Sequence, residues 1–99
     1  MREVRAMTGA EAGLSSNEQM RIALETIVDS GGTAQITDIY AAVERHMGGT
    51  VLSEQGKASL REYVNRKAVK AGYIYPNDPS VEGWRITQAG REFVGFRAS

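Results

Sequence analysis

The side chains best suited to chemistry in this sequence are the cationic and amide groups of residues 57–71. Lys57, Arg61, Asn65 and Arg66 are spaced so that one face of a helix could carry all four. Arginine and lysine hydrogen-bond to the edge of guanine, and asparagine to the edge of adenine. The pattern therefore predicts a helix whose outward face contacts base edges in double-stranded DNA.

Further residues extend this candidate surface. Ser59 and the start of the helix suit a phosphate. Glu62 could orient Arg66 one turn later, or it could accept a hydrogen bond from cytosine. The remaining candidates, which suit the DNA backbone, are Lys67, Lys70, Asn77, Arg85 and Arg91. Two acids, Asp78 and Glu82, lie in or near the turn that contains Asn77, and they argue against tight phosphate contact at that turn.

The residues that an enzyme or a metal site would need are missing. There is no cysteine, and the single histidine, His46, has no second histidine to complete a metal site. A nuclease of the PD-(D/E)xK type needs a lysine that does not follow Asp78 and Glu82 at the required place, and Val51 stands where a phosphate-binding P-loop has its first glycine. We expect no enzymatic activity, no catalytic residue, no cofactor and no metal.

Three aromatic residues, Tyr73, Tyr75 and Trp84, invite comparison with a base-stacking platform or an aromatic cage. A tryptophan on a short strand more often packs onto helices. We therefore expect Trp84 in the hydrophobic core and His46 in a structural place at the end of a helix, where a cation suits the helix dipole.

The first half of the chain predicts two helices. Residues 1–14 lack periodicity and read as a flexible tail. Ser16 and Gln19 form a capping box for a helix over 17–29. Its apolar stripe recurs every three to four residues and consists of Met20, Ala23, Leu24, Ile27 and Val28. After a short extended segment at 33–36, Thr37 caps a helix over 38–47.

Ile39, Tyr40, Val43 and Met47 form the inward face of that second helix. The loop over 50–56 that follows it turns Val51 and Leu52 toward the core.

The second half predicts a helix, a hairpin and a last helix. The helix over 57–71 ends at Gly72, and its inward residues are Leu60, Tyr63, Val64, Ala68 and Ala71. Residues 73–75 and 83–86 read as two strands joined by a turn rich in proline, asparagine and serine. Thr87 then caps a helix over 88–95.

This order of elements predicts a mainly helical α+β fold of the winged helix-turn-helix class, with three helices, a β-hairpin wing and a C-terminal helix. The domain spans 15–95, between the tail at 1–14 and a second tail at 96–99. In helix-turn-helix proteins the second helix of the motif lies in the major groove, and here that is the helix over 57–71.

The segments Ala68-Val69-Lys70-Ala71-Gly72-Tyr73-Ile74 and Gly83-Trp84-Arg85-Ile86-Thr87-Gln88-Ala89-Gly90-Arg91 carry a resemblance to known proteins. They resemble the winged-helix domain at the N-terminus of Mrr-type restriction endonucleases. The ending Arg85-Ile86-Thr87, followed by Gly90-Arg91, is also similar to PadR-like and MarR-like regulators. The resemblance implies DNA binding, with the nuclease active site in a separate domain for which 99 residues leave no room.

Charge is divided unevenly although the formal net charge is zero. Residues 1–56 hold four arginines against eight acids, so their net charge is −4, whereas residues 57–99 hold eight basic residues against four acids and carry +4. Such asymmetry suggests an anionic partner. No apolar run approaches the length of a membrane span and no signal peptide is evident, so we expect a cytoplasmic protein without a membrane partner.

The sequence thus predicts a DNA-binding module, the recognition domain of a restriction-type system, with a nuclease domain or a second copy of the chain as further partners and no small-molecule substrate. Two alternatives stay open. One is a transcriptional regulator or repressor, and the other is a winged helix that is used for protein–protein interaction. An exposed apolar patch and absent DNA binding would mark the second alternative.

Overall fold

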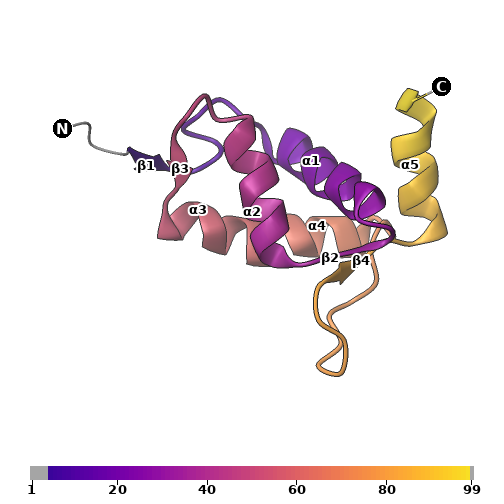
Figure 1. Ribbon diagram of the computed structural model, residues 1–99. Helices are drawn as coiled ribbons and strands as arrows, with labels where there is room; N and C mark the ends of the chain where they lie inside the picture. The colour runs from indigo at the N-terminus through magenta and orange to yellow at the C-terminus, as the bar shows by residue number, and fades with distance from the viewer. Residues whose placement is uncertain (1–4, 99) are drawn as a thin grey trace.

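The computed structural model describes residues 5–98, and the side chains of residues 5–95. It is a mainly helical α+β structure (Figure 1). The elements in chain order are β1 (Ala6–Met7), α1 (Ser16–Asp29), β2 (Thr33–Ala34), α2 (Ile36–Arg45), β3 (Val51–Leu52), α3 (Glu54–Ala58), a π-helical segment (Ser59–Val64), α4 (Asn65–Lys70), β4 (Trp84–Arg85) and α5 (Gln88–Ala98).

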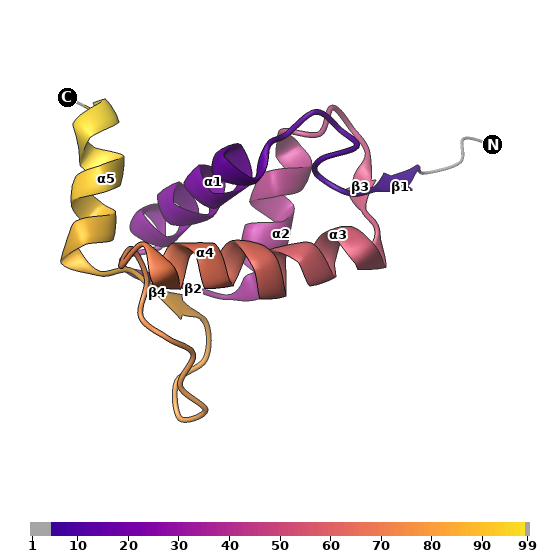
Figure 2. The ribbon, with the colours of Figure 1, turned by 180° about the vertical axis from the view of Figure 1, so that it is seen from behind.

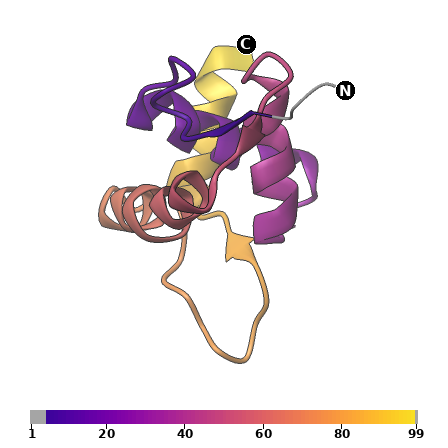
Figure 3. The same cartoon turned by 90° about the vertical axis from the view of Figure 1, so that its left-hand side faces the viewer.

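One continuous helix organises the molecule. α3, the π-helical segment and α4 follow each other without a break, and we call residues 54–70 the long helix. Figures 1 and 2 show α1 and α2 on one side of it and a hairpin, residues 73–87, projecting on the other side. The end-on view in Figure 3 separates the hairpin clearly from the helices. The long helix is therefore open to solvent on the side from which the hairpin projects.

The core lies where α1, α2 and the long helix meet. Its largest fully buried side chains are Leu24, Ile27, Ile39, Val43, Leu60, Val64 and Ile74. All of them except Ile74 come from the apolar stripes that the sequence predicts for the three helices; Ile74 comes from the segment 73–75, which the sequence predicts as a strand. Trp84 is also in the core, with 6% of its surface exposed, as expected.

The hairpin is held by fewer strand contacts than the sequence predicts. β4 pairs antiparallel with β2, with Trp84 opposite Ala34. Residues 73–75, expected as a strand, make a single bridge between Ile74 and Ile86. The N–H of Ile86 also donates to the carbonyl of Gly32 (3.0 Å). The segment that contains Ile86 therefore lies between the segment of Ile74 and that of Gly32. Beyond these pairs the hairpin consists mostly of turns and irregular chain, so it has no long strands.

Residues 5–14 are folded against the domain, whereas the sequence suggests a tail. β1 pairs in parallel with β3, with Met7 opposite Leu52. A Cβ on Gly56 would lie 3.1 Å from the carbonyl oxygen of Met7, so the N-terminal segment also passes close to the start of the long helix. Two-residue strands carry no periodicity, which is why the pattern missed them. Residues 1–4 of the expected tail lie outside the described part.

The start of α1 differs from the prediction by one residue. Ser15 is the N-cap, and its side chain accepts from the N–H of Glu18 (3.1 Å). The carboxylate of Glu18 accepts from the N–H of Ser15 (3.1 Å), which completes the capping box. Gln19 is buried instead and donates to the carbonyl of Leu14 (3.0 Å). Adjacent serines made the two registers equally compatible with the sequence.

We expect Ser15→Ala to lower the free energy of unfolding by about 1 kcal/mol, the usual cost of losing an N-cap. Ser16→Ala is the matched control and should cost less. The hydrogen bond from the N–H of Ser15 has the largest effect on the pKa of Glu18 and lowers it, and the hydrogen bond with the Ser15 side chain lowers this pKa further. The stabilisation by Glu18 is therefore complete at neutral pH and is lost as the pH falls through this lowered pKa. Urea unfolding of the three proteins at two pH values measures both effects.

The ends of three other helices also differ from the prediction. α2 begins at Ile36 after Gln35, which makes no side-chain cap, so Thr37 lies inside the first turn. The long helix begins at Glu54, where the Ser53 side chain accepts from the N–H of Gly56 (3.1 Å). α5 runs on through Ala98, into the segment expected as a tail. Thr87 caps α5 as predicted, since its hydroxyl accepts from the N–H of Gly90 (3.0 Å).

Within residues 5–98 no helix is both long and apolar enough to cross a membrane.

Candidate functional site

The predicted candidates on the long helix fall on different sides of it. Arg61, Glu62, Arg66 and Lys70 are exposed, Lys57, Ser59 and Lys67 are half-buried, and Asn65 is 7% exposed. Asn65 is therefore buried, and the prediction that it points outward is wrong. Tyr63, expected in the core, is 54% exposed.

The π-helical segment explains both of these errors. A π-turn closes its hydrogen bonds over five residues instead of four, so each residue advances less around the axis than in an α-helix. From Ser59 onward the side chains consequently lag behind the predicted α-helical positions. This lag rotates Asn65 toward the core and Tyr63 away from it, while Leu60, Val64 and Ala68 stay buried.

The burial of Asn65 leads to a prediction. Its amide nitrogen is buried without a hydrogen-bond partner in the structure. An unsatisfied buried polar group costs stability, and an apolar group of similar shape removes that cost. We expect Asn65→Leu to keep or raise the melting temperature, which thermal unfolding measures. A clear fall in the melting temperature would show instead that the amide makes a stabilising hydrogen bond in the folded protein.

Arg61 is held in place by a residue of α2. Its guanidinium donates to the hydroxyl of Tyr40 at 2.9 Å. This hydrogen bond raises the pKa of Arg61 further, so the guanidinium remains charged. The ammonium of Lys57 lies 5.7 Å from the centre of the same ring and 3.7 Å from the carboxylate of Glu54. Tyr40 thus contacts two predicted DNA-binding residues, although the sequence suggested only a core role for it.

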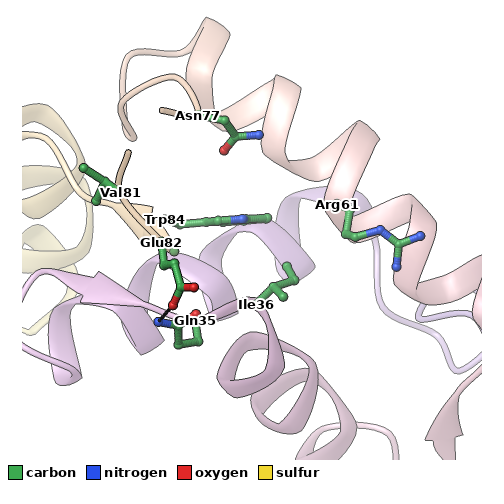
Figure 4. Close-up of a pocket in the computed structure, with 8 residues that line it drawn as sticks. Gln35, Ile36, Arg61, Asn77, Val81, Glu82 and Trp84 are labelled. Carbon is green, nitrogen blue, oxygen red and sulfur yellow. Dashed lines mark hydrogen bonds between the residues drawn. The ribbon is translucent and has the colours of Figure 1, made fainter. Parts of the chain in front are cut away.

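An open hollow of about 380 Å³ lies between the hairpin, the long helix and the start of α2. We call it the hairpin hollow. It is lined by Gln35, Ile36, Arg61, Asn77, Val81, Glu82, Gly83 and Trp84. Figure 4 shows Trp84 between Asn77 of the hairpin and the Glu82–Gln35 pair, with Arg61 on the long helix and its guanidinium turned away from Trp84. The Gln35 amide donates to the Glu82 carboxylate at 3.4 Å across 47 residues of sequence. The structure therefore brings together two predicted candidates, Arg61 and Asn77, and adds Gln35 and Glu82.

A second group of cations lies on the C-terminal part of the long helix. Tyr63, Arg66, Lys67 and Lys70 line a shallow hollow of about 250 Å³, and we call these four residues the α4 cluster. Lys67 donates to the hydroxyl of Ser16 at 3.4 Å. Within the described residues, neither Arg66 nor Lys70 forms an ion pair with a carboxylate. Their charges are therefore available to an anionic partner.

The last two candidates lie elsewhere. Arg85 packs over the ring of Tyr75 (5.0 Å to its centre) and donates to the carbonyl of Pro76 (3.4 Å). Arg91 is on α5, and its guanidinium approaches Gly32 so closely that a Cβ there would lie 2.6 Å away. Neither residue lines the hairpin hollow or the α4 cluster.

The aromatic residues do not form one cage. Tyr73 stacks on Phe93 with ring centres 4.5 Å apart, and Tyr75 lies under Arg85. His46 follows α2, where its Nδ1 is 2.9 Å from the carbonyl oxygen of Ala42. Among the described residues no three histidine, cysteine or acidic side chains gather as a metal site.

The long helix thus has an exposed edge on which Arg66 and Lys70 form no ion pair within the described residues, and the hairpin hollow lies beside this helix. No protein-family model, curated protein or solved structure matches this chain.

Proposed function

We propose that this chain is a winged-helix module that binds double-stranded DNA, with the long helix in the major groove and the hairpin as the wing. The observation that carries the proposal is the exposed edge of the long helix, where Arg61, Arg66 and Lys70 form no ion pair within 4.0 Å of a carboxylate among the described residues. Cations free of acidic partners neutralise phosphates and release their counterions, and that release is the main source of DNA affinity.

The arrangement of the elements supports the same proposal. α1 packs against both α2 and the long helix, and Tyr40 of α2 accepts a hydrogen bond from Arg61. The outer side of the long helix stays open, as a helix-turn-helix reader requires. Helix and hairpin stand on the same side of the molecule, so one duplex could contact both (Figure 3). An overall charge of zero implies modest affinity for a single copy. Additional affinity would come from a nuclease domain that is joined to this module in a restriction-type protein. It could also come from a second copy of the chain in a homodimer.

The test is selection of bound duplexes from a randomised DNA pool, at 50 and 200 mM salt. Parallel pools carry methylated cytosine or methylated adenine. Enrichment of methylated duplexes would favour the restriction-type role, and enrichment of one unmodified sequence would favour a transcriptional regulator. Absence of binding at 50 mM salt would overturn the proposal and would favour a winged helix that binds another protein.

A further inference from the structure

The hairpin hollow combines groups that suit the two bases of one pair. Arginine reads guanine through its O6 and N7 acceptors, and a glutamate accepts from the N4 amino group of cytosine. Arg61 and Glu82 both line the hollow, from the long helix and from the hairpin. We propose that this hollow reads a single G·C base pair in the major groove, with Arg61 on guanine and Glu82 on cytosine. The inference rests on the proposed function, because it requires that the module binds duplex DNA.

The charge of the hollow argues against a phosphate there. Arg61 and Glu82 are the two charged residues that line it, so their charges cancel. A phosphate would lie near the carboxylate of Glu82 and would be repelled, whereas a base edge offers donors as well as acceptors. The α4 cluster, by contrast, is lined by three cations and no acid, which suits the phosphate backbone. Base reading and phosphate binding are thereby assigned to different flanks of the long helix.

The positions of both charged groups are fixed by second contacts. The Tyr40 hydroxyl accepts from one terminal nitrogen of Arg61 at 2.9 Å, which leaves the other nitrogens for a ligand. The amide of Gln35 donates to Glu82 at 3.4 Å. Readers that are held in one geometry lose less conformational entropy on binding and discriminate better between bases. Tyr40 and Gln35 are therefore positioning residues.

An extruded single base is a poorer occupant of the same hollow. Trp84 offers the aromatic surface on which such a base would stack. Its exposed fraction is only 6%, so almost all of the indole is already covered by protein. Stacking would require the core around Trp84 to open. A paired base that presents its edge needs no such movement.

The test compares duplexes that differ only at the position which the wild-type chain selects as G·C. We expect wild type to prefer G·C over A·T there by roughly 5- to 150-fold, the range for one well-formed bidentate contact. Arg61→Lys keeps the charge but loses the planar fork, so the affinity for the G·C duplex should fall toward that for the A·T duplex, which changes little, and the preference should fall to near unity. Tyr40→Phe should reduce the preference only in part.

Glu82→Gln decides between a base and a phosphate. If Glu82 accepts from cytosine, the substitution lowers the preference for G·C and leaves the salt dependence of binding unchanged. If the hollow faces a phosphate, affinity rises for all sequences alike, and the inference is overturned. Asp78→Asn is the matched control: it removes one acid from the same hairpin, where Ser80 donates to the Asp78 carboxylate at 2.7 Å outside the hollow.

Failure of the inference is distinguishable from failure of the proposed function. Binding of all duplexes without a preferred G·C position would overturn the inference and leave DNA binding intact. Absence of any binding by the folded wild-type chain would remove both. Circular dichroism of each variant confirms that a lost preference does not come from unfolding.

Discussion

Under the proposed function, we expect the replacement of both Arg66 and Lys70 by glutamine to lower the affinity for duplex DNA by roughly 60-fold in 0.1 M salt. The physical basis is counterion release, in which each neutralised phosphate contributes a slope of about −0.9 to the plot of log affinity against log salt. Two lost contacts make the slope shallower by about 1.8, and at 0.1 M that difference corresponds to the stated loss. Glutamine suits a helix about as well as arginine and lysine do, so the fold is preserved.

The measurement is a titration of one duplex at four salt concentrations by fluorescence anisotropy. Arg45→Gln is the matched control, because Arg45 is an exposed cation at the end of α2 that lies away from the long helix (Figure 1). We expect its salt slope to match that of wild type. If the double variant and the control weakened binding equally, the effect would reflect overall charge, and the α4 cluster would have no special role in binding DNA.

The loss should be the same for all sequences, since phosphates carry no sequence information. This separates the α4 cluster from the hairpin hollow, where substitutions are expected to change sequence preference and not the salt slope. A double variant that altered the selected sequence would show that Arg66 contacts a base. Arg66 would then read a base, as the spacing on the helix predicts.

The sequence predicted those features that depend on local pattern. The apolar stripe of α1 is a spacing of three and four residues, and the structure buries Leu24 and Ile27 completely. Gly72 was recognisable as a helix end because the position after a helix often needs a positive φ, and its φ is 81°. Trp84 in the core followed from its size and its place on a short strand. Each of these signals lies within a few residues of the feature that it predicts.

The missed features depend on residues far apart in the chain or on two equivalent local choices. Gln35 and Glu82 meet across 47 positions, and no pattern in either segment indicates the other. Tyr40 looked like a core residue because its spacing is that of the α2 stripe, yet its hydroxyl reaches Arg61. The π-helical segment also has no periodic signal of its own. A shift of one residue there was enough to exchange the exposures of Tyr63 and Asn65.

A close backbone contact at Gly90 holds α5 against the base of the hairpin. A Cβ at this position would lie 2.2 Å from the carbonyl oxygen of Tyr73 and 2.7 Å from Cγ1 of Ile86. The first of these atoms belongs to the backbone and already accepts from the N–H of Thr87 (3.0 Å). It is therefore unable to move aside without breaking that hydrogen bond, and α5 itself must shift.

Gly90→Ala should consequently destabilise the protein by about 2 kcal/mol, within the usual range for overpacking, even though alanine is the better helix former by about 1 kcal/mol. In a domain of this size that loss lowers the melting temperature by roughly 10 °C. Gly95→Ala in the same helix is the control: among the described residues, no heavy atom outside its chain neighbours and the backbone of its own helix lies within 4 Å of its Cβ position, so it should raise stability by up to about 1 kcal/mol. Thermal unfolding of the two variants gives the comparison directly. If both raised the melting temperature, α5 would not approach the backbone of Tyr73 as closely as the structure places it.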